Sequence, residues 1–313
     1  MKLRVAVPDF VSPSYFPAIA AVELGFFGRE GLEAEVELLY PVTKTYEALR
    51  EGRLDFVGGA AHAALYAFRD WEGCKLLCAL AQNMYWFLVV RQDLAARSRS
   101  RGDLSVLRGL RVGAAPGPVD GLKRMLVAAG IDPEREVAIG PVPGTAGENI
   151  SFGLAAARAL EEGRIDGFWA NGMAAEIAVR KGTGAVLLDA RRGDGPPGAE
   201  HYTFPALVTA QRTLDERPEA VQGAIRAVVR AQAALRREPQ LAEQAAKRFP
   251  AAERVLITEL IRRDAPYYDP RISEDAVAAL NAFARRTGIL SREVSYERVV
   301  ATRVCDSWRG GES

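Results

Sequence analysis

Cysteine and histidine are scarce in this sequence, with 3 Cys and 2 His among 313 residues. The cysteines, Cys74, Cys78 and Cys305, are odd in number and are not combined with histidines at metal-ligand spacing. This excludes a disulfide framework and a zinc site, so we expect no metal. We expect Cys74 and Cys78 to be buried thiols, on one helix face or at a helix-to-strand junction, because free cysteine is commonly buried.

Long apolar runs and an excess of charge of one sign are also absent. The apolar stretches end well before the length that crosses a membrane, so we expect no membrane insertion. The formal net charge of +1 argues against a nucleic-acid partner. Met1-Lys2 leads straight into a strand-like segment without an apolar signal core. The chain as it stands is therefore expected in the cytoplasm, or in the periplasm or outside the cell if an export signal is missing from it.

Motifs of common enzyme classes are missing as well. The sequence has no G-x-x-x-x-G-K-S/T phosphate loop, no G-x-S-x-G elbow, no H-E-x-x-H zinc motif and no EF-hand loop. We therefore expect no catalytic residues and no cofactor.

One segment of the sequence occurs twice. Residues 48–64 read ALREGRLDFVGGAAHAA, and residues 159–175 read ALEEGRIDGFWANGMAA. In each copy a helix is predicted to end at a glycine, which tolerates the left-handed conformation, and a short buried strand follows. The shared aspartates, Asp55 and Asp166, are expected to satisfy backbone or turn donors rather than to act as acids.

The order of elements around these copies predicts the fold class. A strand, a proline-containing turn and an amphipathic helix precede each copy, beginning at residues 3–7 and 110–114. Alternating strands and helices predict an α/β protein with mainly parallel sheets flanked by helices. A chain of 313 residues suits two lobes. Further helices are expected at 217–237, 240–248, 251–263 and 273–286.

The lobes are expected to exchange strands. The chain is predicted to cross between them near residues 88–93 and again near 203–209. Two antiparallel crossing strands would form a hinge, since few residues need to change backbone angles for closure. The first lobe would contain residues 1–90 and 206–313, and the second lobe residues 91–205.

Several motifs together resemble one known family. Ser14–Ala18 (SYFPA) and Ala21–Leu32 (AVELGFFGREGL) resemble the P-x-x-x-A-x-x-x-G-F-F-x-x-E-G-L signature of the SsuA/THI5-like (NMT1) family. Further matches in the family's order are GRLD (52–55), LRGLRVG (107–113), GRID (163–166) and PEAV (218–221). The resemblance implies the type 2 periplasmic-binding-protein fold. It also implies a solute-binding protein, expected to be monomeric, that delivers a small ligand to an ABC permease and its ATPase.

The same resemblance leaves an enzyme or sensor as the alternative. A minority of the family makes the thiamine pyrimidine phosphate, using a pyridoxal phosphate lysine and a histidine that is consumed. His62 falls close to that histidine. However, Gly58 stands where those enzymes carry the lysine, and residues 200–208 lack their cysteine-rich cluster.

Candidate ligand-binding residues follow the strands. In parallel sheets, ligands bind at the carboxyl ends of strands, beside helix N-termini. The turns at those ends and at the crossings contain Ser12, Ser14, Tyr15, Phe16, Gly59, Ala60, His62, Asn83, Tyr85, Trp86, Pro116, Gly117, Val119, Asp120, Trp169, Asn171, His201 and Tyr202. Two of these keep a structural alternative: Phe16 as a core residue and His62 as a satisfied buried histidine.

The composition of these turns suggests the ligand. Aromatic residues gather there, whereas arginine, which usually meets small hard anions, is scarce. We therefore expect an aromatic or heterocyclic ligand, with any carboxylate or polar substituent held by helix N-termini and His62. The aligned copies set His62 opposite Met173 and Ala60 opposite Asn171. The two lobes should therefore contact different sides of the ligand.

Overall fold

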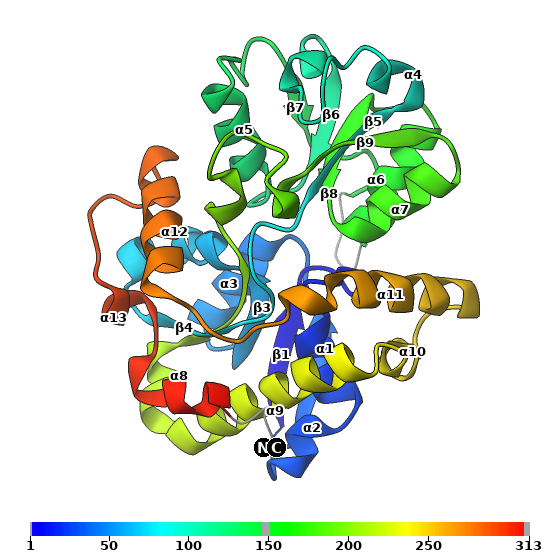
Figure 1. Ribbon diagram of the computed structural model, residues 1–313. Coiled ribbons are helices and arrows are strands. Elements are labelled where there is room, and N and C mark those ends of the chain that lie inside the picture. The colour runs from blue at the N-terminus through cyan, green and yellow to red at the C-terminus, as the bar shows by residue number, and fades with distance from the viewer. Residues whose placement is uncertain (1, 146–150, 310–313) are drawn as a thin grey trace.

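The computed structural model describes residues 2–145 and 151–309 and shows two lobes, one above the other in Figure 1. Within these residues, ten strands form two five-stranded sheets. The strands are β1 (Leu3–Val7), β2 (Ala34–Leu38), β3 (Phe56–Ala60), β4 (Cys74–Ala79), β5 (Phe87–Arg91), β6 (Arg111–Ala114), β7 (Ala138–Gly140), β8 (Gly167–Ala170), β9 (Gly184–Asp189) and β10 (Pro205–Ala210).

Both sheets have the same topology. The first has the order β2-β1-β3-β10-β4 and the second the order β7-β6-β8-β5-β9. In each sheet the fourth strand of this order, β10 or β5, runs antiparallel to its two neighbours, and the remaining pairs are parallel. The duplication in the sequence therefore corresponds to a duplicated sheet.

The antiparallel strands β5 and β10 are the two predicted crossing strands. Their bounds differ by a few residues from the predicted crossings. Residues 87–90 were expected in the first lobe, but they pair with β8 and β9 in the second sheet. Pro205 was expected in the second lobe, but it begins β10 of the first sheet. The apolar run that contains Phe87 does not reveal which sheet it joins. The remaining division of the chain into lobes stays a prediction.

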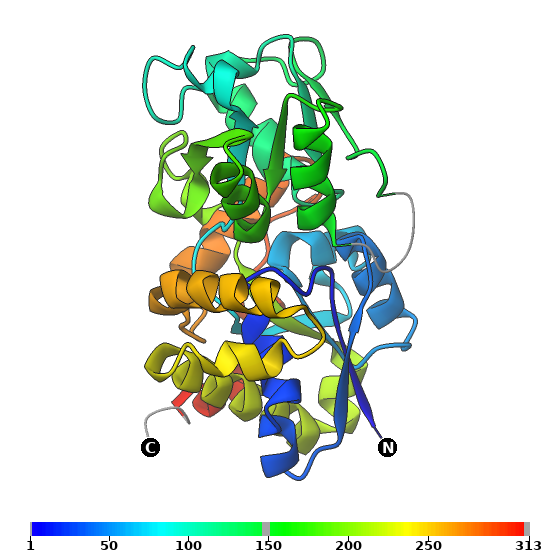
Figure 2. The same cartoon turned by 90° about the vertical axis from the view of Figure 1, so that its right-hand side faces the viewer.

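Helices cover both faces of the two sheets (Figures 1 and 2). They are α1 (Phe16–Glu23), α2 (Phe26–Arg29), α3 (Val42–Arg50), α4 (Gln92–Ala95), α5 (Val119–Ala128), α6 (Phe152–Glu161), α7 (Gly172–Arg180), α8 (Gln211–Glu216), α9 (Pro218–Arg237), α10 (Leu241–Ala245), α11 (Ala251–Asp264), α12 (Glu274–Arg286) and α13 (Tyr296–Val299). The predicted helices after residue 216 are confirmed as α9 to α12. Helix α9 packs on α1 and α2, and α11 contacts α7 across the lobe boundary.

The two repeated segments have the same backbone conformation and hydrogen bonding at their equivalent positions. Gly52 and Gly163, which follow α3 and α6, have φ values of +77° and +67°, the left-handed conformation expected there. The carboxylate of Asp55 accepts a hydrogen bond from the backbone N–H of Arg4 at 2.8 Å. Asp166 accepts the equivalent bond from Arg111 at 3.0 Å. Both aspartates therefore fix the start of a neighbouring strand, as predicted.

The aspartate of the second copy, Asp166, has more charged partners than Asp55. Asp166 also binds the guanidinium groups of Arg111, at 2.9 Å, and Arg91, at 2.7 Å. These hydrogen bonds and charges lower the pKa of Asp166 to about 2. Asp55 pairs instead with Arg217, at the start of α9.

The buried thiols are confirmed, although their setting differs from the prediction. Cys74 and Cys78 both lie in β4, where their side chains belong to the core of the first lobe. They stand four residues apart on this strand, but the register of β4 against β10 shifts between Cys78 and Leu76, so the even spacing does not place both on one face. Among the helices that the structure describes, none is long and apolar enough to cross a lipid bilayer.

Candidate ligand-binding site between the lobes

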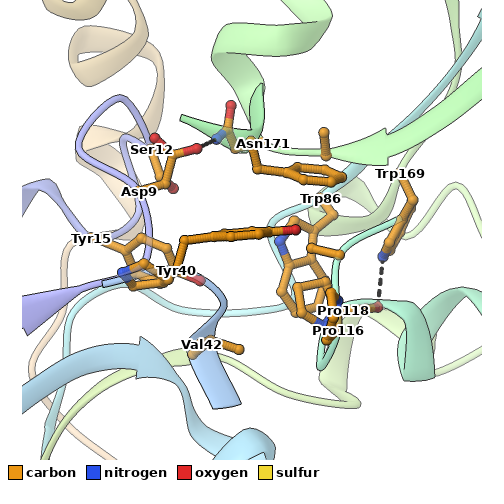
Figure 3. A pocket seen from close by; sticks show the side chains of 14 residues that line it. Asp9, Ser12, Tyr15, Tyr40, Val42, Trp86, Pro116, Pro118, Trp169 and Asn171 are labelled. Atoms are coloured by element: carbon orange, nitrogen blue, oxygen red, sulfur yellow. Dashed lines mark hydrogen bonds between the residues drawn. The ribbon is translucent and has the colours of Figure 1, made fainter. Parts of the chain in front are cut away.

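A small cavity lies between the lobes, where the carboxyl ends of β1, β6 and β8 meet (Figure 3). Its volume is about 40 Å³, which is room for about one water molecule. The lining residues are Pro8, Asp9, Ser12, Tyr15, Tyr40, Val42, Trp86, Ala115, Pro116, Pro118, Phe152, Trp169, Ala170 and Asn171. The structure therefore represents a closed arrangement, and an organic ligand needs the lobes to separate or side chains to move.

Five of the 14 residues that line the cavity are aromatic. Tyr40 of the first lobe stacks on Phe152 of the second, with ring centroids 5.9 Å apart and an interplanar angle of 15°. Trp86, on the first crossing, lies 5.9 Å from Trp169 between ring centroids. The indole N–H of Trp169 donates to the Pro118 carbonyl at 2.9 Å, which fixes that ring (Figure 3). Such flat, fixed apolar faces are suited to a ring compound.

Three polar residues of the cavity, Asp9, Ser12 and Asn171, lie together at one side of it (Figure 3). The carboxylate of Asp9 is buried and accepts a hydrogen bond from Nδ2 of Asn171 at 2.8 Å. Burial raises the pKa of Asp9 above its ordinary value, while the hydrogen bonds that it accepts oppose the shift. The hydroxyl of Ser12 is fully buried and has no hydrogen-bond partner among the residues that the structure describes.

His62 bridges the lobes beside this cavity without lining it. Its Nε2 lies 3.0 Å from the carbonyl oxygen of Gly117, which can only accept, so Nε2 carries a proton and donates. Its Nδ1 lies 2.9 Å from the hydroxyl of Thr203 and accepts from it in the neutral ring. The side chain is fully buried, and that burial lowers the pKa of His62. The structural alternative for His62 therefore has the better geometric support.

A second polar bridge lies on another side of the interface. Arg191, which follows β9 in the second lobe, donates to Asp264 at 2.6 Å and to the Ser14 hydroxyl at 2.8 Å. Its guanidinium lies 4.7 Å from the ring centroid of Tyr267. Arg191 was not among the candidate residues, so this contact was not anticipated from the sequence.

The structure brings only part of the predicted site to the cavity. The predicted residues that line it are Ser12, Tyr15, Trp86, Pro116, Trp169 and Asn171. Others lie at the interface around it, namely Ser14, His62, Tyr85, Gly117 and Asp120. The ligand-binding role of all these residues stays a prediction.

The remaining predicted residues do not line the cavity. Phe16, Gly59 and Ala60 are buried in the first lobe, so Phe16 takes its structural alternative. Val119 begins α5, and Asn83 lies in the crossing segment with a φ of +65°. The ring of Tyr202 stacks on Phe283 at 4.9 Å between centroids. The side chain of His201 is 55% exposed.

Sequence reasoning missed several lining residues, above all Asp9, Tyr40 and Phe152. Asp9 and Tyr40 follow β1 and β2, so the rule that ligands meet the carboxyl ends of strands applied to both. Asp9 comes directly after Pro8, in a segment that reads as a turn. Phe152 begins a helix, and no sequence signal connects it with Tyr40.

Comparison with known proteins identifies the fold. A family model described as the NMT1-like family matches residues 10–249. Comparison with curated proteins gives no significant match. Among solved structures, a protein from Bordetella bronchiseptica RB50 has a TM-score of 0.77 at 18% identity, and the alignment covers 98% of each chain.

Two further structures illustrate the range of functions on this fold. The alkanesulfonate-binding protein SsuA from Xanthomonas axonopodis pv. citri, bound to MOPS, has a TM-score of 0.69 at 14% identity and 97% coverage of each chain. A cysteine-to-serine mutant of DszB, in complex with biphenyl-2-sulfinic acid, has a TM-score of 0.63 at 16% identity, with 98% of this chain and 99% of DszB covered. At these identities the likeness shows the fold, and the predicted fold class is confirmed.

Proposed function

This chain belongs to the NMT1-like family, and on that premise we propose that it is a solute-binding protein that captures a small organic molecule between its lobes for an ABC importer. The observation that supports this most is the cavity at the lobe boundary, whose walls come from both lobes and from the crossing residue Trp86. A ligand held there contacts both lobes only when they are closed. It therefore shifts the population toward the closed form, which a permease can recognise.

The walls of the cavity favour an aromatic or heterocyclic ligand. The rings of Tyr40, Phe152, Trp86 and Trp169 offer apolar faces from both lobes. None of the described residues that line the cavity is lysine or arginine. A small hard anion would usually be met by such a cation. In this proposal the ligand ring enters between the aromatic walls and takes the volume that the Tyr40 side chain partly fills in the closed structure.

A ligand screen tests the proposal. Native mass spectrometry of the purified protein identifies any molecule that copurifies, and a thermal-shift panel compares aromatic acids, pyrimidines, taurine and nitrate. We expect ring compounds to raise the Tm and to change the fluorescence of Trp86 and Trp169. The variant Trp86→Ala should lose that response, while Trp308→Ala, far from the cavity, should keep it. Tight binding of taurine or nitrate without any response to ring compounds would refute the aromatic assignment.

The partner and the compartment follow from the same proposal. A binding protein of this kind works outside the cytoplasm and docks on a permease with its ATPase. Cell fractionation of the native host tests the compartment, and a finding in the cytoplasm alone would contradict the transport role.

An enzyme is the second candidate, because the desulfurization enzyme DszB shares the fold. The three cysteines of this chain lie outside the cavity. Polar side chains in the cavity include those of Asp9, Ser12, Asn171 and the two tyrosines. This set is better suited to binding and orienting a ligand than to nucleophilic attack on it. An absorption band of bound pyridoxal phosphate, or turnover of a ligand found in the screen, would favour the enzyme.

A further inference from the structure

Asp9 stands at the cavity between three donors of the opposite lobe. It follows β1 in the first lobe and is 4% exposed. Its carboxylate accepts one hydrogen bond from its own loop, from the Val11 N–H at 3.0 Å. The other three come from the second lobe: Ser151 Oγ at 3.1 Å, Gly153 N at 3.3 Å and Asn171 Nδ2 at 2.8 Å. Most of the hydrogen bonds of this carboxylate therefore exist only when the lobes are closed.

The three donors of the second lobe mark the starts of two helices. Ser151 is the N-cap residue of α6, but its hydroxyl does not cap its own helix and binds Asp9 instead. Asn171 caps α7 through Oδ1, which accepts from the N–H groups of Met173 and Ala174, and its Nδ2 remains for Asp9. A Cβ atom on Gly153 would lie 2.8 Å from Asn171 Oδ1, so only glycine allows the two helix starts to approach this closely.

This position is one that favours a negative charge. The first N–H groups of a helix lack partners within the helix, and the helix dipole is positive there. From the sequence, such a position was expected to hold a carboxylate of the ligand. In the structure the protein's own carboxylate occupies it.

The hydrogen-bond pattern fits the ionised form of Asp9. Backbone N–H groups and the Asn171 amide nitrogen can only donate, and a protonated carboxyl would need an acceptor for its own proton. Among the four partners, only the Ser151 hydroxyl could accept one. A carboxylate that accepts from all four leaves no group unpaired.

Ser12 supplies an independent sign that the cavity receives a ligand. Its side chain is fully buried and lines the same cavity, yet its hydroxyl oxygen has no partner among the described residues. A buried hydroxyl without a hydrogen bond is energetically unfavourable. A polar group of a bound ligand would satisfy it. Figure 3 shows Ser12 beside Asp9, so that polar group would lie close to the carboxylate.

We propose that Asp9 is a built-in anion that fills the anion-binding position of the second lobe, so that the cleft selects neutral or cationic ring compounds and rejects sulfonates and carboxylates. The inference rests on the proposed function, because it specifies the ligand class of the same cleft. A second negative charge beside Asp9 would be repelled in a site of low dielectric, and no lysine or arginine among the described lining residues compensates for it. Asp9 is thus a specificity-determining residue.

The decisive experiment measures anion binding with and without this carboxylate. Wild-type protein and the variants Asp9→Ala and Asp9→Asn are titrated with methanesulfonate and benzenesulfonate, followed by calorimetry and tryptophan fluorescence. We expect the affinity for at least one sulfonate to increase by about tenfold or more in both variants. Glu293→Gln, which removes one negative charge from a side chain that is 88% exposed, should change nothing.

One result would overturn the inference, namely a folded Asp9 variant with no gain in sulfonate affinity over wild-type protein. Asp9 would then be only a contact between closed lobes. The variant Asp9→Asn keeps the size of the side chain, so the experiment does not depend on Asp9→Ala folding.

The outcome also separates this inference from the proposed function. If wild-type protein binds a ring compound and the Asp9 variants gain no sulfonate binding, only the inference fails. If the variants gain sulfonate binding while wild-type protein binds no organic ligand in any screen, the exclusion of anions by Asp9 holds, but the ligand class and the proposed function both fail.

Discussion

The two copies of the repeated segment are alike where they build a sheet and different where they face the cleft. Asp55 and Asp166 hold equivalent backbone N–H groups at the starts of β1 and β6. The copies diverge directly after this aspartate, and three residues after it Gly58 in β3 stands at the place of Trp169 in β8. Both positions face the crossing strand of their sheet, opposite Leu207 and Leu88. A duplicated scaffold can therefore keep its sheet contacts and still acquire an asymmetric cleft.

The largest effect is expected at Trp169, the position where the two copies differ most. Trp169 is fully buried, and Trp169→Ala removes its ring from both the core and the cavity wall. We expect the free energy of unfolding to fall by about 3–5 kcal/mol, as for other buried aromatic side chains. Urea denaturation measures it. A loss below about 1 kcal/mol would mean that the ring does not contribute to the core.

The next largest effect is expected at the aspartate that both copies share, Asp166 in the second copy and Asp55 in the first. Asp166→Ala leaves the N–H of Arg111 and two guanidinium groups without their carboxylate, and we expect a loss of about 2 kcal/mol. Asp55→Ala should cost a similar amount. Unequal losses, differing by more than about 2 kcal/mol, would show that the repeats have diverged in their scaffold too.

The same carboxylate predicts a pH dependence. The pKa of Asp166 lies at about 2 in the folded protein, below the ordinary value of 3.8 for this group. Because the folded-state pKa is the lower one, the stabilisation is present above 3.8 and is lost as the pH falls from there to about 2. In Asp166→Ala this part of the acid transition should disappear, as measured by the unfolding free energy at several acidic pH values.

A smaller effect is expected at Gly58. A Cβ atom there would lie 3.2 Å from side-chain atoms of Val7, Ala18 and Leu80. These contacts are tight but involve side chains that can shift, so Gly58→Ala should cost about 1–2 kcal/mol through overpacking. Thermal unfolding measures the change. A stabilised variant would show that the first lobe could carry a side chain where the second carries tryptophan.

The smallest effect concerns the His62 bridge between the lobes. Burial lowers the pKa of His62, whose nearest charged group is Asp120 at 3.7 Å, and the protonated ring is disfavoured in the closed form. Closure should therefore weaken as the pH falls below 6.5, the ordinary pKa of histidine, by less than about 1 kcal/mol at about pH 6.

Small-angle X-ray scattering across this pH range can follow the His62 effect. In His62→Gln the radius of gyration should become independent of pH. A pH dependence that remains in the variant would assign the effect to another group.

How much could be predicted from the sequence depends on the range of the contacts. The fold followed from local signals, such as Gly52 and Gly163 ending helices, and from their repetition. Trp169 and Asn171 were placed at the cleft because they directly follow a predicted strand. The role of Asp9 could not be predicted, since its partners Ser151 and Gly153 lie more than 140 residues away in the sequence. His62 was expected to bind a ligand because of its residue type. Only the distance from its Nε2 to the Gly117 carbonyl shows that it forms a bridge between the lobes.

The crossing strands also bear on how the nascent chain acquires its structure. The second sheet draws all its strands from residues 87–189, a continuous stretch of the chain. The first sheet has β10, which begins at Pro205, inserted between β3 and β4. During synthesis the N-terminal lobe thus emerges first but is completed last, and its edge strand β4 has to wait for a partner from the far side of the other lobe. The sheet that begins first in the sequence can therefore be completed only after all strands of the second sheet have been synthesised.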